Sequence, residues 1–205
     1  MEKRIVAVQP HVELLTVTPN PERHIELCGR EAYGSAQAPT LESCRDWIRK
    51  RIAGGEPDVI EHAVLTIRIT CSRVVSHELV RHRLAAYTQR SQRFTEKGIN
   101  EIVVPVDWPP DRVDELLADY QEAYEKYLKW RAAGIKRQDA RYILPTGNAT
   151  RVVATWNFRQ ARHVLTMRMP KAAQPEFRVL ARAMWEMLAT EWSSCFEDLD
   201  VAAAA

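Results

Sequence analysis

Hydrophobic and polar positions alternate most clearly in the segment Ala63–Cys71. From its third residue on, apolar side chains occupy every second position, and threonine or arginine occupies the positions between them. Because successive side chains of a strand point to opposite faces, this alternation predicts a strand with one buried face. Thr150–Thr155 predicts a second strand, and Ile5–Val8 and Val12–Val17 predict two short strands within the first 20 residues.

Helical spacing and helix-ending residues mark the other elements. Thr40 precedes a stripe of apolar residues that starts at Leu41 and ends at Ile52, and Gly54-Gly55 follows it. Threonine is a favoured N-cap and glycine a favoured helix end, so a helix is predicted between them. Further helices are predicted over Glu22–Gly29, from Asp111 to Gly134 with tyrosines that pack, and over Gln138–Leu144, Phe158–Met167 and Ala172–Trp192.

Length and composition favour one domain without a membrane segment. With 46% hydrophobic content, residues 1–205 are predicted to form a single domain with one core, and residues 201–205 a disordered tail. A net charge of +2 gives no support for general binding to nucleic-acid polymers or membranes. A membrane-spanning helix needs about 18 consecutive apolar residues. The sequence contains no such stretch, so we expect a cytoplasmic protein.

The four cysteines predict neither a metal site nor disulfides. Cys28, Cys44, Cys71 and Cys195 form no CxxC pair and have no metal-ligand spacing with histidine. We expect reduced thiols and no bound metal. Cys44 and Cys71 lie on the apolar faces of the predicted helix and strand, so both are expected to be packed.

The stretch Ser72–Phe94 is strongly basic. It contains five arginines and two histidines, and Glu78 is its one acid. Guanidinium groups suit phosphate oxygens because they offer planar, paired donors, so an anion site is one interpretation and a solvated basic helix face is the other. Apolar helical spacing stops beyond Leu84, which predicts a helix ending near Arg83 and an irregular or extended segment over Ala85–Phe94.

Within this stretch, Arg81-His82-Arg83 is followed after seven residues by Ser91-Gln92-Arg93. The arrangement RHR-x7-S-x-R resembles the signature of the flavin-dependent thymidylate synthases, and it specifies five positions at fixed spacing. The resemblance continues through ARYILP at 140–145, TRVVATWNFRQARHVLTMR at 150–168 and AQPEFR at 173–178. It covers roughly Cys28 to Phe196, nearly the whole chain.

The resemblance implies an α+β fold, a single mixed α/β domain with a central sheet flanked by helices. It also implies a homotetramer whose active sites are shared between subunits. By the same resemblance, NADPH reduces FAD, methylenetetrahydrofolate donates one carbon, and dUMP is methylated at C5 to dTMP. The chain has no GxGxxG fingerprint, so side chains rather than a glycine-rich turn would hold the nucleotides.

Position by position, the resemblance assigns two groups of binding residues. The group that contacts the flavin is Arg81, His82, Arg83, Leu84, Gln89, Asn157, Arg159 and His163. The group that holds the uridylate is Glu78, Ser91, Gln92, Arg93, Arg141 and Arg168. The bound flavin would supply the hydride, and the protein would supply placement and electrostatics.

Arg168 and Ser91 are the candidate catalytic residues. Adding a carbon at C5 builds negative charge on the ring carbonyls, and a fixed cation such as Arg168 stabilises this charge best where water is excluded. Ser91 would be a nucleophile only beside a general base, and a hydrogen-bonding role is favoured because its neighbours are mostly arginines. The expected packing of Cys44 and Cys71 disfavours the activated cysteine of the cysteine-dependent thymidylate synthases.

The chain departs from the family's pattern just before the alternating strand. Glu56 stands at the histidine of the family's G-H-x-S-x-x-E-H run, and Asp58 stands at a hydroxyl residue near the flavin phosphates. An acid at such a place is unfavourable unless an arginine neutralises it. There are three smaller departures. Ala32 stands where the family has a small hydroxyl or thiol residue, Ala86 stands where it has a serine, and Phe94 stands where it has a tyrosine.

The sequence leaves several functions open. The first hypothesis is a thymidylate synthase acting on dUMP, and the second is the same flavin and folate chemistry on another pyrimidine nucleotide, such as a UMP C5-methylase in modified-nucleoside biosynthesis. One 2′-hydroxyl separates these substrates, and the sequence identifies no residue that touches it. A flavin- and uridylate-binding protein without catalysis is a third hypothesis, disfavoured because mere binding has little need of Arg168.

Overall fold

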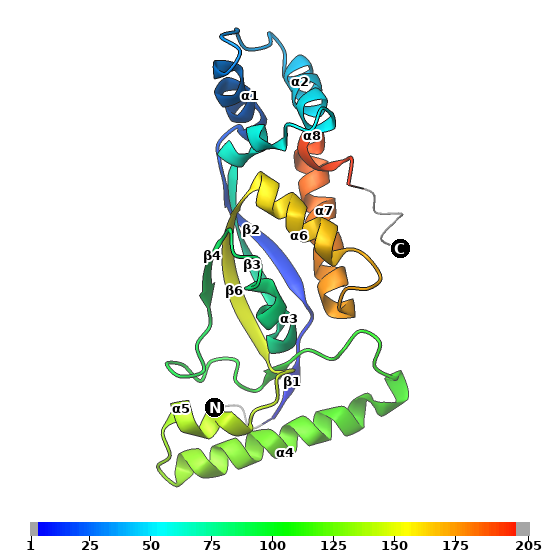
Figure 1. Ribbon diagram of the computed structural model, residues 1–205. Coiled ribbons are helices and arrows are strands. Elements are labelled where there is room, and N and C mark those ends of the chain that lie inside the picture. The colour runs from blue at the N-terminus through cyan, green and yellow to red at the C-terminus, as the bar shows by residue number, and fades with distance from the viewer. Residues whose placement is uncertain (1–3, 200–205) are drawn as a thin grey trace. The chain divides into compact units, whose positions relative to one another are not determined.

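The strands form two sheets, and the computed structural model describes residues 4–199 (Figure 1). In the smaller sheet, β1 (Val6–Ala7) pairs in parallel with β5 (Glu101–Ile102). The larger sheet has the strand order β2–β3–β6–β4. Its strands are β2 (His11–Val17), β3 (Val64–Ser72), β6 (Ala149–Asn157) and β4 (Ala86–Gln89). The strands predicted from alternation and β-branched content are confirmed, with shifted ends.

The chain divides into two compact units, each built from separate segments. The first unit comprises residues up to His11, Ile69–Arg81 and Thr88–Val152, and the second comprises Val12–Arg68, His82–Tyr87 and the residues from Val153 on. Strands β3 and β6 contribute residues to both units. That the chain acts as a single domain stays a prediction, and the tail predicted at 201–205 lies outside the described residues.

Strand β3 has the buried face that its alternation predicts. Leu65, Ile67, Ile69 and Cys71 are at most 1% exposed, so they belong to the core. Between them, Thr66 is partly exposed, and its hydroxyl forms a 3.0 Å hydrogen bond with the hydroxyl of Thr155 on β6. Apolar burial on one face and polar cross-strand pairing on the other therefore hold β3 in register.

The first unit is organised around a long helix and a small tyrosine-rich core. Tyr124 and Tyr127 are buried in it with Ile99 and Ala140, which confirms that these tyrosines pack. Asn148 joins the loop segments by donating its amide N–H to the carbonyl of Ile99 at 2.9 Å. The helices of this unit are α3 (Arg73–Leu79), η2 (Pro110–Arg112), α4 (Val113–Ala132), α5 (Arg137–Ala140) and η3 (Arg141–Ile143).

The second unit contains the remaining helices. Among them, the helix that follows Thr40 begins where the sequence predicts. The Thr40 hydroxyl accepts a hydrogen bond from the backbone N–H of Ser43 at 3.1 Å, which forms a capping box. The ring of Phe158 packs between Trp192 and Phe196 at 5.4 and 5.1 Å between ring centroids. The helices are α1 (Pro21–Glu31), α2 (Leu41–Ala53), η1 (Pro57–His62), α6 (Phe158–Arg168), α7 (Pro175–Glu191) and α8 (Ser193–Phe196).

The end of the basic helix was predicted wrongly. Helix α3 ends at Leu79 rather than near Arg83, because no apolar face continues past it: Val80 is 40% exposed and Leu84 is 78% exposed. The RHR residues therefore lie in the turn between α3 and β4. At the other end, the Ser72 hydroxyl caps α3 by accepting from the backbone N–H of Val75 at 3.2 Å.

Smaller corrections concern helix ends and short helices. Leu41 begins α2 but is 44% exposed, so it lies outside the core although it continues the apolar stripe. The last long helix starts at Pro175, because proline is favoured in the first turn of a helix. The short helices η1 and α8 have too few residues for an apolar period to appear, and they were not predicted.

Candidate functional site

Arg168, the last residue of α6, is held from two sides in the second unit. Its Nε donates a hydrogen bond to Nε2 of His82 at 3.0 Å. Its guanidinium carbon lies 4.9 Å from the centroid of the Phe177 ring, within the range of a cation–π contact. Phe177 is 1% exposed on α7, so it cannot move aside readily. The candidate catalytic cation therefore has a defined position.

His82 is neutral because of its surroundings. It is 7% exposed, and burial, then the positive charge of Arg168, then His163, lower its pKa to about 4. A guanidinium N–H can only donate, so Nε2 of His82 accepts and the ring proton is on Nδ1. The His163 ring meets it edge-on at 5.6 Å between centroids. A neutral histidine fixes Arg168 without opposing its charge.

Two further side chains fix the backbone of His82. The hydroxyl of Tyr87 donates to the carbonyl of His82 at 2.8 Å, and Nε1 of Trp156 donates to the hydroxyl of Tyr87 at 3.3 Å. Trp156 is 1% exposed on β6. The chain from a buried tryptophan through Tyr87 anchors the turn that carries the RHR residues.

The residues next to His82 have the chemistry that a flavin requires. Arg83 is exposed, and Leu84 is 78% exposed, which is unusual for a leucine. An apolar ring system needs apolar surface, and a diphosphate needs cations, so this turn suits FAD as a ligand. Arg81, the remaining residue of the RHR run, is exposed as well.

The flavin candidates on and beside α6 are partly engaged within the protein. Asn157 caps α6 through its side-chain oxygen, which accepts from the backbone N–H of Gln160 at 2.8 Å. Arg159 is exposed and forms an ion pair with Glu61. Of these candidates, His163 is the one that lies against His82.

In the first unit, Arg73 and Arg141 are neighbouring cations, and neither forms an ion pair with an acid among residues 4–199. Burial and then the charge of Arg141 lower the pKa of Arg73, so the two guanidinium groups repel each other. Arg73 donates Nη2–H to the carbonyl of Arg90 at 3.2 Å, while its buried Nε has no hydrogen-bond partner among residues 4–199. Two arginines with a spare buried donor are typical of an anion site. The sequence showed Arg73 in the basic run, but nothing in its spacing distinguished it.

The signature loop has a defined local structure. The Ser91 hydroxyl accepts from the backbone N–H of Arg93 at 3.1 Å, and within the described residues no general base bonds to it. The guanidinium of Arg93 lies 5.2 Å from the centroid of the Phe94 ring. Gln89 donates to the hydroxyls of Ser76 and Thr150 at 3.0 and 3.3 Å, so its amide is engaged within the protein. Gln92 and Glu78 are partly exposed on either side of β4 in sequence.

The acid at position 56 is neutralised within its own unit. The Glu56 carboxylate accepts from the hydroxyl of Tyr33 at 2.7 Å and from Nη1 of Arg51 at 3.1 Å. The Tyr33 hydrogen bond and the Arg51 charge lower the pKa of Glu56, which stays ionised and paired. This departure from the family's pattern is therefore locally compensated, while Asp58 is exposed.

The cysteines do not offer a ready nucleophile. Cys44, Cys71 and Cys195 are fully buried, which confirms the packing expected for the first two. Burial raises the pKa of Cys44 and that of Cys195 to about 12 in each case. Because the thiolate is the reactive form, neither of these two is activated at neutral pH. Cys28 is partly exposed, with its sulfur 3.8 Å from Nε2 of His24.

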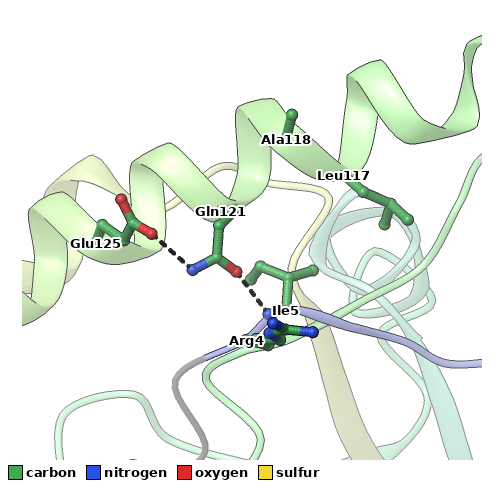
Figure 2. Close-up of a pocket in the computed structure, with 6 residues that line it drawn as sticks. All are labelled: Arg4, Ile5, Leu117, Ala118, Gln121 and Glu125. Carbon is green, nitrogen blue, oxygen red and sulfur yellow. Dashed lines mark hydrogen bonds between the residues drawn. The ribbon is translucent and has the colours of Figure 1, made fainter.

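A cavity of about 440 Å³ beside α4 contains none of the predicted site residues. Figure 2 shows Gln121 between Ile5 and Glu125: its side-chain oxygen accepts from the backbone N–H of Ile5 at 2.9 Å, and its amide donates to Glu125 at 3.0 Å. These bonds tie the N-terminal segment to α4. The part of the chain that the structure describes contains no helix long and apolar enough to cross a membrane.

Comparison with protein families gives one decisive match. Residues 13–192 match the model of the family described as "Thymidylate synthase complementing protein". The chain belongs to this family. The family membership inferred from the RHR-x7-S-x-R motif is thus confirmed. The histidine of this motif is the one that accepts the hydrogen bond from Arg168.

Two relatives named flavin-dependent thymidylate synthase show how the family similarity is distributed. The protein from Sulfurisphaera tokodaii is 44% identical over 154 residues, which are 73% of this chain and 58% of the relative. The protein from Mycobacteroides abscessus is 36% identical over 202 residues, which are 88% of this chain and 80% of the relative. The chain thus spans less than two thirds of the length of the archaeal relative.

A solved structure shares the fold of this chain. A UMP/dUMP methylase, PolB, from Streptomyces cacaoi, determined with 5-Br dUMP bound, superposes with a TM-score of 0.79 at 22% identity. The match covers 94% of this chain and 96% of that one. The mixed α/β fold with sheets flanked by helices is therefore confirmed.

Proposed function

We propose that the protein is a flavin-dependent thymidylate synthase that methylates dUMP at C5 to dTMP. Methylenetetrahydrofolate donates the carbon, and NADPH is the reductant through FAD. The observation that carries the proposal is the hydrogen bond from Arg168 to a neutral, buried His82. It supplies a fixed cation in a chain whose relatives from Sulfurisphaera tokodaii and Mycobacteroides abscessus are named flavin-dependent thymidylate synthase.

Arg168 stabilises negative charge on the uracil ring. When a carbon is added at C5, electron density moves onto the ring carbonyls, and a guanidinium placed beforehand lowers the energy of that state without reorganising. Phe177 and His82 keep the guanidinium in place before the substrate arrives. Because His82 is neutral, it adds no second cation that would push Arg168 away.

Arg73, Arg93 and Arg141 bind the phosphate of the nucleotide. The assignment is supported by the mutual repulsion of Arg73 and Arg141 and by the buried Nε of Arg73, which has no hydrogen-bond partner in the described part of the chain. Ser91 and Gln92 contribute hydrogen bonds, and the bond between Ser91 and the Arg93 backbone favours this role over that of a nucleophile. Glu78 completes the proposed uridylate group as an acceptor for a ring N–H.

The flavin binds at the turn of the RHR residues. Arg83 and Leu84 contact it directly, because both side chains are exposed and chemically suited to it. When bound and reduced by NADPH, the flavin would supply the hydride that completes the methyl group, and it would leave this step as FAD. Its other ligands are Arg81, His82, Gln89, Asn157, Arg159 and His163, and a cytoplasmic homotetramer shares these sites between subunits.

The second candidate is a methylase for UMP. It is favoured by one observation: the structurally similar PolB is described as a UMP/dUMP methylase. The two candidates differ only in a 2′-hydroxyl, which a site can either bond or exclude.

Parallel assays test the proposal. The purified protein is incubated anaerobically with FAD, NADPH, methylenetetrahydrofolate and either dUMP or UMP, and products are identified by mass. Methylation of dUMP alone is the expected result. Product from UMP alone would replace the first candidate with the second, and no product from a flavin-loaded enzyme would contradict both.

A further inference from the structure

A basic cavity lies beside the signature loop, within the first unit. It has a volume of about 320 Å³ and is lined by Arg93, Phe94, Arg131, Lys136, Arg137 and Gln138. Its walls come from the segment after β4, the end of α4 and the segment that enters α5, and α5 packs on α4 (Figure 1).

One of the four cations in this cavity is balanced. Nε of Arg131 donates to the carboxylate of Glu96 at 2.9 Å, and the hydroxyl of Tyr127 donates to the same oxygen at 3.0 Å. Burial acts to raise the pKa of Glu96, but these contacts outweigh it and hold the pKa below its ordinary value. Glu96 is therefore ionised and compensates Arg131.

The other three cations form no such pair, and Glu96 partly compensates Arg137, whose charge also lowers the pKa of that carboxylate. Among the described residues, Arg93, Lys136 and Arg137 form no ion pair with an acid. Nη1 of Arg137 donates to the backbone carbonyl of Phe94 at 3.2 Å, which fixes its position without neutralising it. Three positive charges around one cavity raise the local concentration of anions, and their attraction for a ligand adds up.

The cavity has room for a ligand larger than a single phosphate. Its volume equals that of about ten water molecules at about 30 Å³ each. Guanidinium groups bind phosphate and carboxylate oxygens in pairs, and an ammonium adds a point charge. A ligand with two or more such groups can engage several of these cations at once.

We propose that this cavity binds a small polyanion, a chain of carboxylates or a cluster of phosphates, next to the bound nucleotide. The inference rests on the proposed function in one respect: Arg93 lines the cavity and also belongs to the proposed nucleotide group. Two co-substrates of that reaction carry the required chemistry, a folate with an oligo-γ-glutamyl tail and the phosphates of NADPH.

Binding measurements on the intact protein with FAD and saturating dUMP test the inference. Triglutamate and tripolyphosphate serve as probes at low salt, with titration calorimetry as the readout. We expect at least one of them to bind, and Lys136→Gln and Arg137→Gln to weaken it about tenfold together. Glutamine at 137 is two bonds shorter than arginine and loses the bond to the Phe94 carbonyl, so Lys136→Gln is also measured alone, because it leaves that bond intact.

The matched control removes the same charge outside the cavity. Lys129 lies on α4 with its ammonium 5.7 Å from the Trp130 ring centroid, and Lys129→Gln is expected to change the affinity less than twofold. KM values of the Lys136→Gln and Arg137→Gln variants separate the two candidate ligands. A higher KM for triglutamyl but not for monoglutamyl methylenetetrahydrofolate shows that the cavity binds the folate tail. A higher KM for NADPH but not for NADH shows that it binds the phosphates of NADPH.

The inference is overturned if neither probe binds, or if Lys129→Gln weakens binding as much as the cavity variants. In either case, continued methylation of dUMP leaves the proposed function intact. Conversely, polyanion binding that depends on Lys136 and Arg137 in a protein that methylates no uridylate supports the cavity and contradicts the proposed function.

Discussion

Arg168 and His82 are 86 residues apart in the chain, yet Nε of one donates to Nε2 of the other at 3.0 Å. The histidine is the central residue of the RHR motif, and the arginine closes α6. The contact gives that histidine a positioning role that does not require it to touch a substrate. It also makes the position of Arg168 dependent on the protonation of His82.

The free energy of unfolding should decrease as the pH falls from about 6.5 to about 4, because His82 takes up a proton more readily in the unfolded chain than in the fold. Its pKa is lowered from 6.5 in the unfolded chain to about 4 in the fold, so the unfolded state binds more protons in this window. The effect amounts to about 3 kcal/mol once the pH is below both pKa values. It is absent above this window, where His82 is neutral in both states.

Urea unfolding of wild type and His82→Gln at several pH values measures this effect. The variant should show a flatter dependence between pH 6.5 and 4, because glutamine has no proton to gain. His62→Gln serves as the control, since that histidine is exposed and does not contribute to the pKa shift of His82. An identical pH dependence in wild type and His82→Gln would refute the role of His82.

Patterns among neighbouring residues correctly predicted those features of the fold that depend on local sequence. The alternation from Leu65 to Cys71 predicted β3, and Thr40 predicted the start of α2. The first prediction depends on the burial of one face of a strand, and the second depends on the capping of a helix N-terminus. The signature Arg81-His82-Arg83 and its partner Ser91-Gln92-Arg93 identified the family.

Interactions between distant residues were beyond the sequence. Nothing in the spacing of Arg168 indicates that it bonds His82, or that Arg73 leaves a buried Nε free near Arg141. The end of α3 at Leu79 was missed because the exposure of Val80 depends on the surrounding tertiary structure. The residue-by-residue assignment of the flavin and uridylate groups stays a prediction.

Removal of the cysteines should leave the reaction running. Burial keeps Cys44 and Cys195 as neutral thiols, and Cys71 is fully buried as well. A variant with all four cysteines replaced by alanine is expected to methylate dUMP within about tenfold of wild type, with a stability loss of a few kcal/mol at most from the lost packing.

Turnover and circular dichroism of this variant are measured together. Circular dichroism and flavin content show whether the variant is folded and loaded. Complete loss of turnover in a folded, flavin-loaded variant would establish a cysteine nucleophile and contradict the proposed chemistry.

Arg73→Gln should weaken dUMP binding through its phosphate. Losing one charge-assisted contact costs about 1.5–3 kcal/mol, which is about a ten- to hundredfold rise in the dissociation constant. Deoxyuridine, which has no phosphate, should bind both proteins equally. Arg112→Gln is the control, because Arg112 is exposed and paired with Glu115. An equal loss for dUMP and deoxyuridine would show that Arg73 does not bind the phosphate.

The central claim is that Arg168 promotes carbon transfer to a uridylate held by this protein. Its most direct test is a single-turnover experiment with reduced holoenzyme, dUMP and methylenetetrahydrofolate labelled in its methylene carbon. We expect the label in the C5 methyl group of dTMP, and about a hundredfold or slower formation by Arg168→Ala with unchanged flavin content. Labelled product at the wild-type rate from Arg168→Ala, or no labelled product from wild type, would contradict the account.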